Sequence, residues 1–279
     1  ISALAPCVCE SSNEMTCQLH AGCVFARSNY SGCYPAQMNE RAHRRKLGQN
    51  YLIDPVILFE IERAINPQKN NIFFEIGPGT GALTKSLMGE DIKILAMDLD
   101  EENINTLQAN FYHDNHQFIH GDILHESLDF LSESAHRVVG NLPYNISTQI
   151  ILKLILHSPN IVDMHFLVQK EVAHRVCSSP GSKDWGRLAL KIGAFFQSTA
   201  LFNVPPEAFD IKPKVQSTLM RLIPRKDPQI SLSQYPDFSA LVDMAFANKR
   251  KNIKNNLKKT SIDLVKLNIN PLARAEELS

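Results

Sequence analysis

The sequence has no apolar run of the length that a membrane-spanning helix needs, which is about 20 residues. It also has no excess of either charge, because 29 Lys and Arg residues balance 29 Asp and Glu residues. We therefore expect no membrane span, whereas the zero net charge says nothing for or against a charged partner. The 279 residues are enough for one full domain and a smaller one.

Cysteine is scarce over most of the chain. Five of the six cysteines lie in the first 33 residues, and the sixth is Cys177. The rest of the chain thus has no framework for disulfides, which is typical of a cytoplasmic protein. The early cysteines lack the paired C-x2-C spacing of common zinc sites, and the histidines show no metal-ligand spacing. We interpret residues 1–37 as a Cys-rich appendage, with a metal-binding extension as the alternative, and expect no metal site in the protein.

From residue 54 onwards, short apolar runs alternate with segments of helical spacing. Asp54 and Pro55 are suited to begin the first helix, as N-cap and first helical residue. Strands are predicted at 72–74, 92–97, 117–120, 137–139 and 164–168, and helices at 101–109 and 148–156. This alternation predicts a doubly wound, mainly parallel α/β sheet over residues 38–224, to which residues 189–204 would add late strands.

The composition changes after the proline-containing linker between Pro224 and Pro236. Residues 231–279 are predicted to form a small helical domain, truncated at Ser279 because no finishing element is evident. From Met244 to Thr260 there are six Lys or Arg residues and no acid, and a second basic cluster precedes the first motif. Two cationic zones are typical of a protein that binds a polyanion, although solvated helix faces would look the same. The predicted phosphate contacts are Arg44, Arg45, Lys46, Lys249, Arg250, Lys251 and Lys254.

A glycine-rich motif, Glu75-Ile-Gly-Pro-Gly-Thr-Gly81, follows the first predicted strand and precedes a helix. Glycines there allow a ligand to approach the backbone, and Asp98 ends the next strand, where it could accept hydrogen bonds from ribose hydroxyls. The spacing is G-x-G-x-G, unlike the G-x-G-x-x-G of dinucleotide sites, and Glu75 would repel a pyrophosphate. A carboxylate beside the turn instead suits the cationic end of S-adenosylmethionine. Asp122, which ends the third strand, would accept from the adenine amine of that cofactor.

The turn Asn141-Leu142-Pro143-Tyr144 follows the fourth predicted strand and is the most specific feature of the sequence. An exocyclic amine is a poor nucleophile because its lone pair is delocalised into the ring. The Asn141 side-chain carbonyl and the Leu142 backbone carbonyl could accept the two amine hydrogens and direct the lone pair at a methyl group. Pro143 would stiffen the turn, and Tyr144 would stack on the target base. Positioning of this kind supplies about 7–11 kcal/mol and needs neither a metal nor a covalent nucleophile.

Seven motifs, in this order, resemble the KsgA family of ribosomal RNA adenine N6,N6-dimethyltransferases over residues 38–279. They are LGQNYL at 47–52, EIGPGTG at 75–81, GD at 121–122, GNLPYNIS at 140–147, QKEV at 169–172, PPEAF at 205–209 and AFANKRK at 245–251. The resemblance implies a Rossmann-like methyltransferase domain followed by a small helical, RNA-binding domain. It also implies dimethylation of two adjacent adenosines in a hairpin loop near the 3′ end of 16S rRNA, within immature small ribosomal subunits. We expect a cytoplasmic monomer that uses S-adenosyl-L-methionine.

The resemblance also assigns site residues, position by position. The cofactor-binding set is Gln49, Asn50, Leu52, Glu75, Gly77, Gly79, Asp98, Asp122, Ile123 and Asn141. The catalytic set, which would surround the target base, is Asn141, Leu142, Pro143, Tyr144 and Phe209. Phe209 would close the face of the base opposite Tyr144. The family commonly has Glu where Asp98 stands, so we expect the shorter side chain to hold the ribose more loosely. Residues 1–37 match nothing in the family.

Three other functions compete with this interpretation. A macrolide-resistance methylase acting on large-subunit rRNA would use the same catalytic turn, but the motifs after Gln169 favour the small-subunit enzyme. A DNA adenine methyltransferase usually has two prolines in the corresponding turn, where this chain has Leu142 and Pro143. A non-catalytic RNA-binding assembly factor would keep the fold, but the intact Asn141 and Tyr144 favour catalysis.

Overall fold

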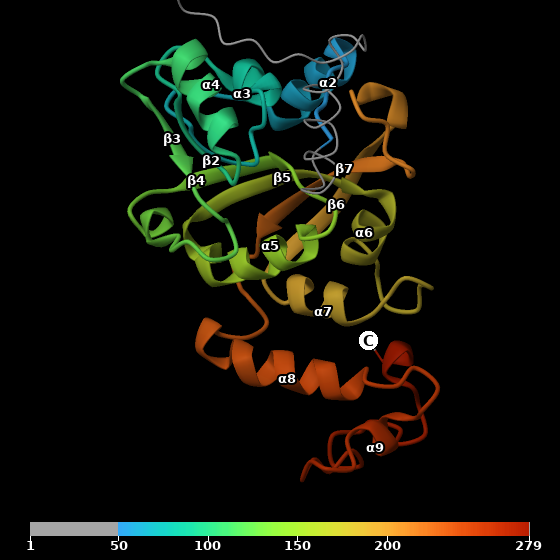
Figure 1. Cartoon of the computed structure of the whole chain (residues 1–279). Coiled ribbons are helices and arrows are strands. Elements are labelled where there is room, and N and C mark those ends of the chain that lie inside the picture. Colours follow the sequence, from blue (N-terminus) through green and yellow to red (C-terminus); the bar gives the residue numbers. More distant parts are fainter. Residues whose placement is uncertain (1–49, 279) are drawn as a thin grey trace, which may run out of the picture. The chain divides into compact units, whose positions relative to one another are not determined.

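The computed structural model describes residues 50–278, and its main feature is a seven-stranded sheet with the strand order β3-β2-β1-β4-β5-β7-β6 (Figure 1). The strands are β1 Ile72–Ile76, β2 Lys93–Asp98, β3 His116–His120, β4 His136–Asn141, β5 Ile161–Gln169, β6 Phe196–Val204 and β7 Ser217–Pro224. The predictions for residues 1–37, Arg44, Arg45, Lys46 and Gln49 lie outside the described residues.

The first five strands in this order are parallel, whereas β7 is antiparallel to both of its neighbours, β5 and β6. All five strands predicted before residue 170 are present within a few residues of their predicted bounds, so the mainly parallel α/β class is confirmed. No strand is predicted at β7, which follows the Pro-rich stretch 205–213 and ends at Pro224, the first residue of the predicted linker.

The prediction of strands throughout residues 189–204 is half wrong. Helix α7, Arg187–Gly193, occupies the first part, and the strand β6 begins only at Phe196. Leu188 and Ile192 pack against the large core cluster, whereas Leu190 packs against a separate C-terminal cluster. Apolar residues at every second position suggest a strand. Here Leu188 and Ile192 lie on one face of a helix and Leu190 lies on the opposite face, because the helix packs between two apolar clusters.

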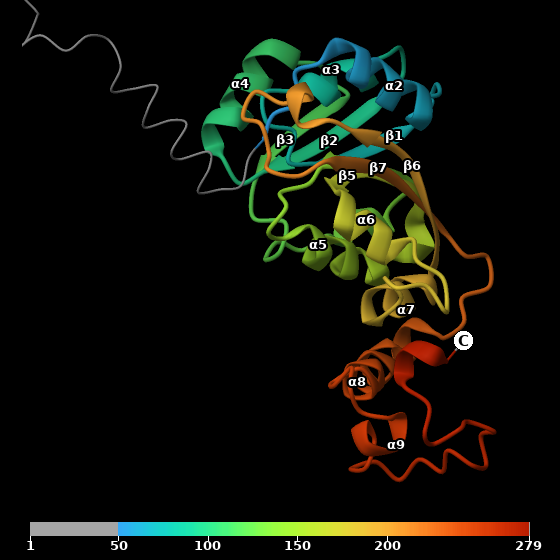
Figure 2. The ribbon, with the colours of Figure 1, turned by 90° about the vertical axis from the view of Figure 1, so that its right-hand side faces the viewer.

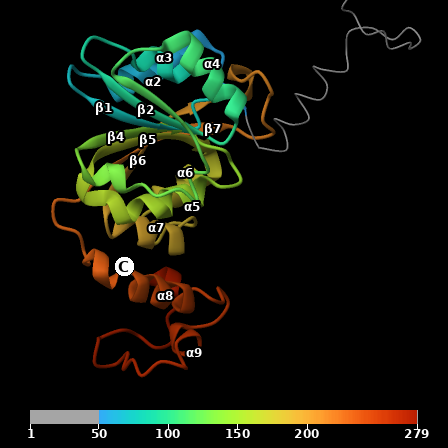
Figure 3. The same cartoon turned by 60° about the vertical axis from the view of Figure 1, so that its left-hand side comes forward.

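Two layers of helices enclose the sheet. The helices are α2 Pro55–Ile65, α3 Ala82–Leu87, α4 Glu101–Phe111, α5 Ser147–Leu154, α6 Lys170–Val176, α7, α8 Tyr235–Ala245 and α9 Ile253–Asn256. Helices α2, α3 and α4 cover one face, and α5, α6 and α7 cover the other (Figure 2 and Figure 3). Successive residues of β1 therefore enter different cores: Phe73 packs with Ile61 of α2, and Phe74 belongs to the cluster of α5. In residues 50–278, no helix combines the length and apolarity of a membrane span.

The C-terminal segment has an apolar cluster of its own. Phe246 and Ile253 are buried in it, together with residues of α8 and with Leu257. Ser231 begins this segment with a capping box that includes Gln234. The segment also contacts α7, where the largely buried Lys191 donates to Asp243 of α8 at 2.8 Å.

Arg137 anchors the edge of the sheet that is remote from the carboxyl ends of the parallel strands. Its guanidinium binds both carboxylate oxygens of Asp163 on β5, each at 2.8 Å. It also donates to the carbonyls of Ile65 and Asn66 at the end of α2, and it lies over the Phe73 ring at 5.3 Å. A bidentate, nearly buried pair of this kind is strong because both ions keep their hydrogen bonds.

We predict that Arg137→Ala lowers the free energy of unfolding by about 3 kcal/mol, because Asp163 would remain charged and buried without its partner. Urea unfolding measures the effect. Arg63→Ala is the matched control, because Arg63 pairs with Glu60 in the open, where a pair contributes at most about 1 kcal/mol. Equal losses from the two variants would show that the Arg137 network is not a stabilising anchor.

Candidate active site

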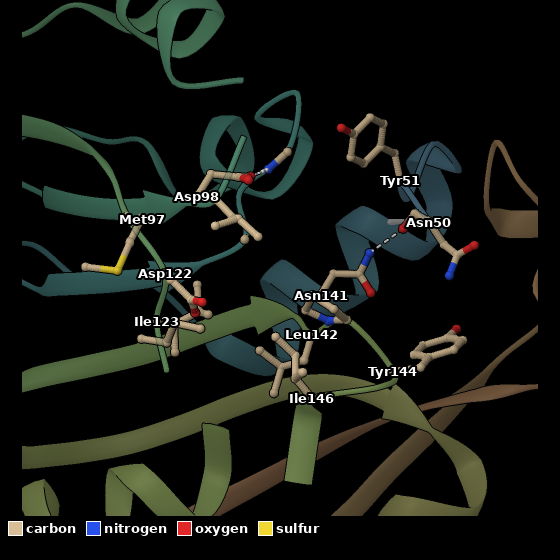
Figure 4. Close-up of a pocket in the computed structure, with 16 residues that line it drawn as sticks. Asn50, Tyr51, Met97, Asp98, Asp122, Ile123, Asn141, Leu142, Tyr144 and Ile146 are labelled. Atoms are coloured by element: carbon tan, nitrogen blue, oxygen red, sulfur yellow. Dashed lines mark hydrogen bonds between the residues drawn. The ribbon is translucent and has the colours of Figure 1, made fainter. Parts of the chain in front are cut away.

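A cleft opens at the carboxyl ends of β1, β2, β3 and β4 (Figure 4). Parallel strands bring their carboxyl ends to one edge, so motifs far apart in the sequence meet there. The lining residues are Asn50, Tyr51, Ile76, Gly77, Gly79, Met97, Asp98, Leu99, Gly121, Asp122, Ile123, Asn141, Leu142, Pro143, Tyr144 and Ile146.

The glycine-rich turn after β1 is held tightly against its neighbours. Gly79 has a φ of +56°, and a Cβ atom there would lie 2.7 Å from the Tyr51 ring, so a side chain is excluded twice over. The Gly79 amide donates to Asp98 at 2.9 Å, and the Tyr51 hydroxyl donates to Asn103 at 3.2 Å. The turn therefore presents bare backbone to the cleft.

Asp98 is fixed by three hydrogen bonds. One carboxylate oxygen accepts from Gly79 and from the Asn103 side chain, and the other accepts from the Asp100 amide at 2.9 Å. Burial raises the pKa of the carboxyl, and these hydrogen bonds oppose the shift. A carboxylate has about four acceptor positions, so about one remains for a ligand in the cleft.

Asp122 begins the loop after β3. Its carboxylate accepts from the Leu124 amide at 2.9 Å and contacts the His125 ring at 2.8 Å. The hydrogen bond from Leu124 is the main reason that the pKa of Asp122 lies below its usual value. The carboxylate is therefore ionised at neutral pH and lies beside Ile123, which is buried in the cleft wall.

Asn141 is the last residue of β4, and its side-chain nitrogen donates to the Asn50 carbonyl at 2.7 Å. The side-chain oxygen is therefore the part of the amide left to accept from a ligand. The Leu142 amide donates to Leu167 on β5 at 3.0 Å, which fixes the next residue of the turn as well.

Tyr144 completes the turn, and its hydroxyl lies 2.5 Å from the hydroxyl of Ser217 on β7. Ser217 is fully buried, so it holds the phenol from within the sheet. Ser217 was not predicted as a site residue, because no sequence motif marks it. Tyr51 and Leu99 were also missed, although each directly adjoins a predicted residue, Asn50 and Asp98.

Phe209 does not have the predicted position. Its ring is 2% exposed and belongs to the core cluster of Leu52 and Ile61, and it does not line the cleft. A backbone bridge between Leu52 and Phe209, after the short turn Pro206–Ala208, directs the ring into the core. The structure therefore does not bring Phe209 to the cleft, and its contact with a target base stays a prediction.

Glu75 and Leu52 also differ from expectation, because both line a smaller cavity beside the cleft. Glu75 is 1% exposed and accepts from the Thr84 hydroxyl at 2.7 Å. Burial raises the pKa of Glu75 to about 7, so it is far from fully ionised at neutral pH. Glu75 is therefore only partly ionised at neutral pH, and its charge beside the cofactor stays a prediction.

The basic residues after α8 are solvent-exposed. Lys249 lies 3.9 Å from Glu276, whereas Arg250, Lys251 and Lys254 have no acidic partner in residues 50–278. Within the same residues, no cluster of His, Cys, Asp and Glu suited to a metal is found.

Known relatives match the chain over most of its length. A family model described as ribosomal RNA adenine dimethylase matches residues 40–278. A ribosomal RNA small subunit methyltransferase A from Nitrosospira multiformis is 40% identical over 238 residues, 85% of this chain and 92% of that protein. The protein of that name from Pseudomonas aeruginosa is 38% identical over 248 residues, 87% of this chain and 92% of that protein.

Two solved structures share the fold. A dimethyladenosine transferase from Plasmodium falciparum has a TM-score of 0.70 at 24% identity and covers 82% of this chain and 92% of its own. The 23S rRNA methyltransferase ErmE has a TM-score of 0.64 at 23% identity, over 82% and 96%. With the family model matching 239 residues, 40 to 278, this chain belongs to the family of ribosomal RNA adenine dimethylases.

Proposed function

We propose that the protein transfers methyl groups from S-adenosyl-L-methionine to the N6 amines of two adjacent adenosines in 16S rRNA, within immature small ribosomal subunits. The observation that carries the proposal is that one cleft is shared by the Asn141–Tyr144 turn, the glycine-rich turn, Asp98 and Asp122. The names of the relatives at 38% and 40% identity, both small-subunit methyltransferases, support this choice of RNA.

The cleft fits a nucleoside joined to an amino acid. Asp98 keeps an acceptor position for a ribose hydroxyl, and the ionised Asp122 suits the adenine amine. Ile123 and Leu99 offer apolar contact to the adenine ring, and the bare backbone at Gly77 leaves room for the methionine part. When bound, the cofactor supplies an electrophilic methyl group on sulfur.

The target base would be oriented by the turn after β4. The Asn141 side-chain oxygen and the Leu142 carbonyl, which accepts no other hydrogen bond in residues 50–278, would take the two N6 hydrogens. The lone pair would then be directed away from both oxygens, and one N6 proton would be released once the nitrogen has bonded to the methyl group. Only one N6 hydrogen remains for the second transfer. Stacking on Tyr144 would therefore contribute more to the orientation of the base in the second transfer than in the first.

We assign residues 38–224 to the methyltransferase domain and 231–279 to RNA binding. The exposed Arg250, Lys251 and Lys254 suit contacts with phosphates, because none of them has an acidic partner to displace within residues 50–278. We further propose that the protein acts as a monomer in the cytoplasm.

The function is tested by incubating the purified chain with labelled cofactor and immature small subunits from cells that lack this modification. We expect label in N6,N6-dimethyladenosine of 16S rRNA. Label only in a parallel reaction with large-subunit RNA would support the macrolide-resistance type instead. Binding to the particles without any transfer would support a non-catalytic assembly factor.

We predict that Asn141→Ala lowers kcat by about 100-fold or more, because a misplaced amine loses its alignment with the methyl group. Cofactor affinity, measured by calorimetry, should change far less than kcat. Gln149→Ala, an exposed residue of α5, is the control and should behave like the wild type. Near-normal turnover of Asn141→Ala would mean that another group orients N6.

We predict that replacing Lys249, Arg250 and Lys251 by Ala weakens RNA binding and reduces the slope of log K against log salt by about 2. The slope falls because fewer counterions are released from phosphates. Replacing Lys69, Lys85 and Lys93, three exposed lysines of the sheet domain, removes the same charge and should leave the slope nearly unchanged. Equal slopes in both triple variants would show that the basic cluster is a solvated helix face that does not contact phosphates.

A further inference from the structure

Lys153 lies in the last turn of α5 and does not line the cleft. Its ammonium donates to two backbone carbonyls of the loop after β3, to Ile123 at 2.8 Å and to Glu126 at 2.6 Å. The helix that carries Lys153 begins directly after the Asn141–Tyr144 turn. A single side chain thus connects the element behind the catalytic turn to the loop that holds Asp122.

The loop at 121–126 is organised from one end by Asp122. The Asp122 carboxylate accepts from the Leu124 amide, and its backbone carbonyl accepts from the amides of His125 and Glu126 at 2.9 and 2.8 Å. These bonds all satisfy amide donors. The carbonyls of Ile123 and Glu126 need a donor of their own. Among residues 50–278, Lys153 is the one group that donates to them.

The ammonium is suited to this position. Its stem can lie along apolar surface while its three donors reach more than one carbonyl, and a charged donor strengthens each bond. Its charge also acts on Asp122: after the Leu124 hydrogen bond and the His125 contact, Lys153 adds to the causes that lower the pKa of that carboxyl. The loop is therefore held in shape from outside the cleft, and the charge of Lys153 adds a small part to the stabilisation of the Asp122 carboxylate.

We infer that Lys153 is a positioning residue for recognition of the cofactor's adenine: it fixes the loop so that Asp122 meets the exocyclic amine and Ile123 meets the ring. This inference rests on the proposed function. Lys153 acts through Asp122 and Ile123 without touching the ligand, so its loss should blunt the discrimination between an adenine amine and a carbonyl oxygen at the same ring position.

The test compares two stable ligands, S-adenosylhomocysteine and its deaminated form, S-inosylhomocysteine, by calorimetry on the full chain. The wild type should prefer the adenosyl ligand. Lys153→Met, which keeps the apolar stem but has no donor, should weaken that ligand about tenfold and the inosyl ligand less than about threefold. Lys153→Arg keeps a charged donor and should retain most of the preference. Lys85→Met, an exposed lysine on α3, is the matched control.

An unchanged ratio of the two affinities in Lys153→Met would overturn the inference, even if both ligands bound more weakly, because a loss of general stability affects both alike. A loss of the ratio in Lys153→Arg as large as in Lys153→Met would overturn it too. If Lys153→Met does not fold, Lys153→Leu, which also has no donor, gives the same comparison. Failure of the wild type to bind S-adenosylhomocysteine would instead count against the proposed function, which separates the two outcomes.

Discussion

The hydrogen bond from the Asn141 side-chain nitrogen to the Asn50 carbonyl decides what the site can do. An amide has one donor end and one acceptor end, and this bond engages the donor. The acceptor is left for the cleft, and in the proposed mechanism it takes one hydrogen of the target amine. The bond also joins two segments separated by 91 positions, so the segment before α2 and the end of β4 must both be in place before the turn is competent.

Other residues that line the cleft are also held in place by hydrogen bonds to neighbouring elements. Asp98 is pinned by backbone amides and Asn103, Tyr144 by Ser217 on the antiparallel strand, and the Asp122 loop by Lys153 on α5. In each case a residue that lines the cleft is kept in one orientation by a residue outside its own strand or loop. Precision of this kind matters because an in-line transfer depends on alignment, and small displacements of the reacting atoms cost large factors in rate.

Burial explains the two residues that differ from their expected roles. Glu75 looked like a charge beside the cofactor, but desolvation raises its pKa to about 7 and Thr84 occupies one oxygen. Phe209 looked like a stacking platform, but it gains more by packing with Leu52 in the core than by lying open to water. A sequence motif gives the position of such a side chain along the chain, and it does not give the direction in which the side chain points.

The sequence alone determined the parallel strands, the two acidic strand ends at Asp98 and Asp122, and the turn at Asn141. These follow from local patterns, because apolar runs make strands and the residues that follow them meet at one edge of a parallel sheet. Only the tertiary structure decided the strand β7 with Ser217, the helix α7, the inward ring of Phe209 and the contact of Lys153 with the Asp122 loop. Each of these depends on which distant segment packs alongside. Contacts of this kind join residues that are far apart in the sequence: Thr218 and Asn203 are separated by 15 positions, and Tyr51 and Asp210 by 159. Local periodicity contains no information on that choice, since packing and hydrogen bonding between distant segments fix it.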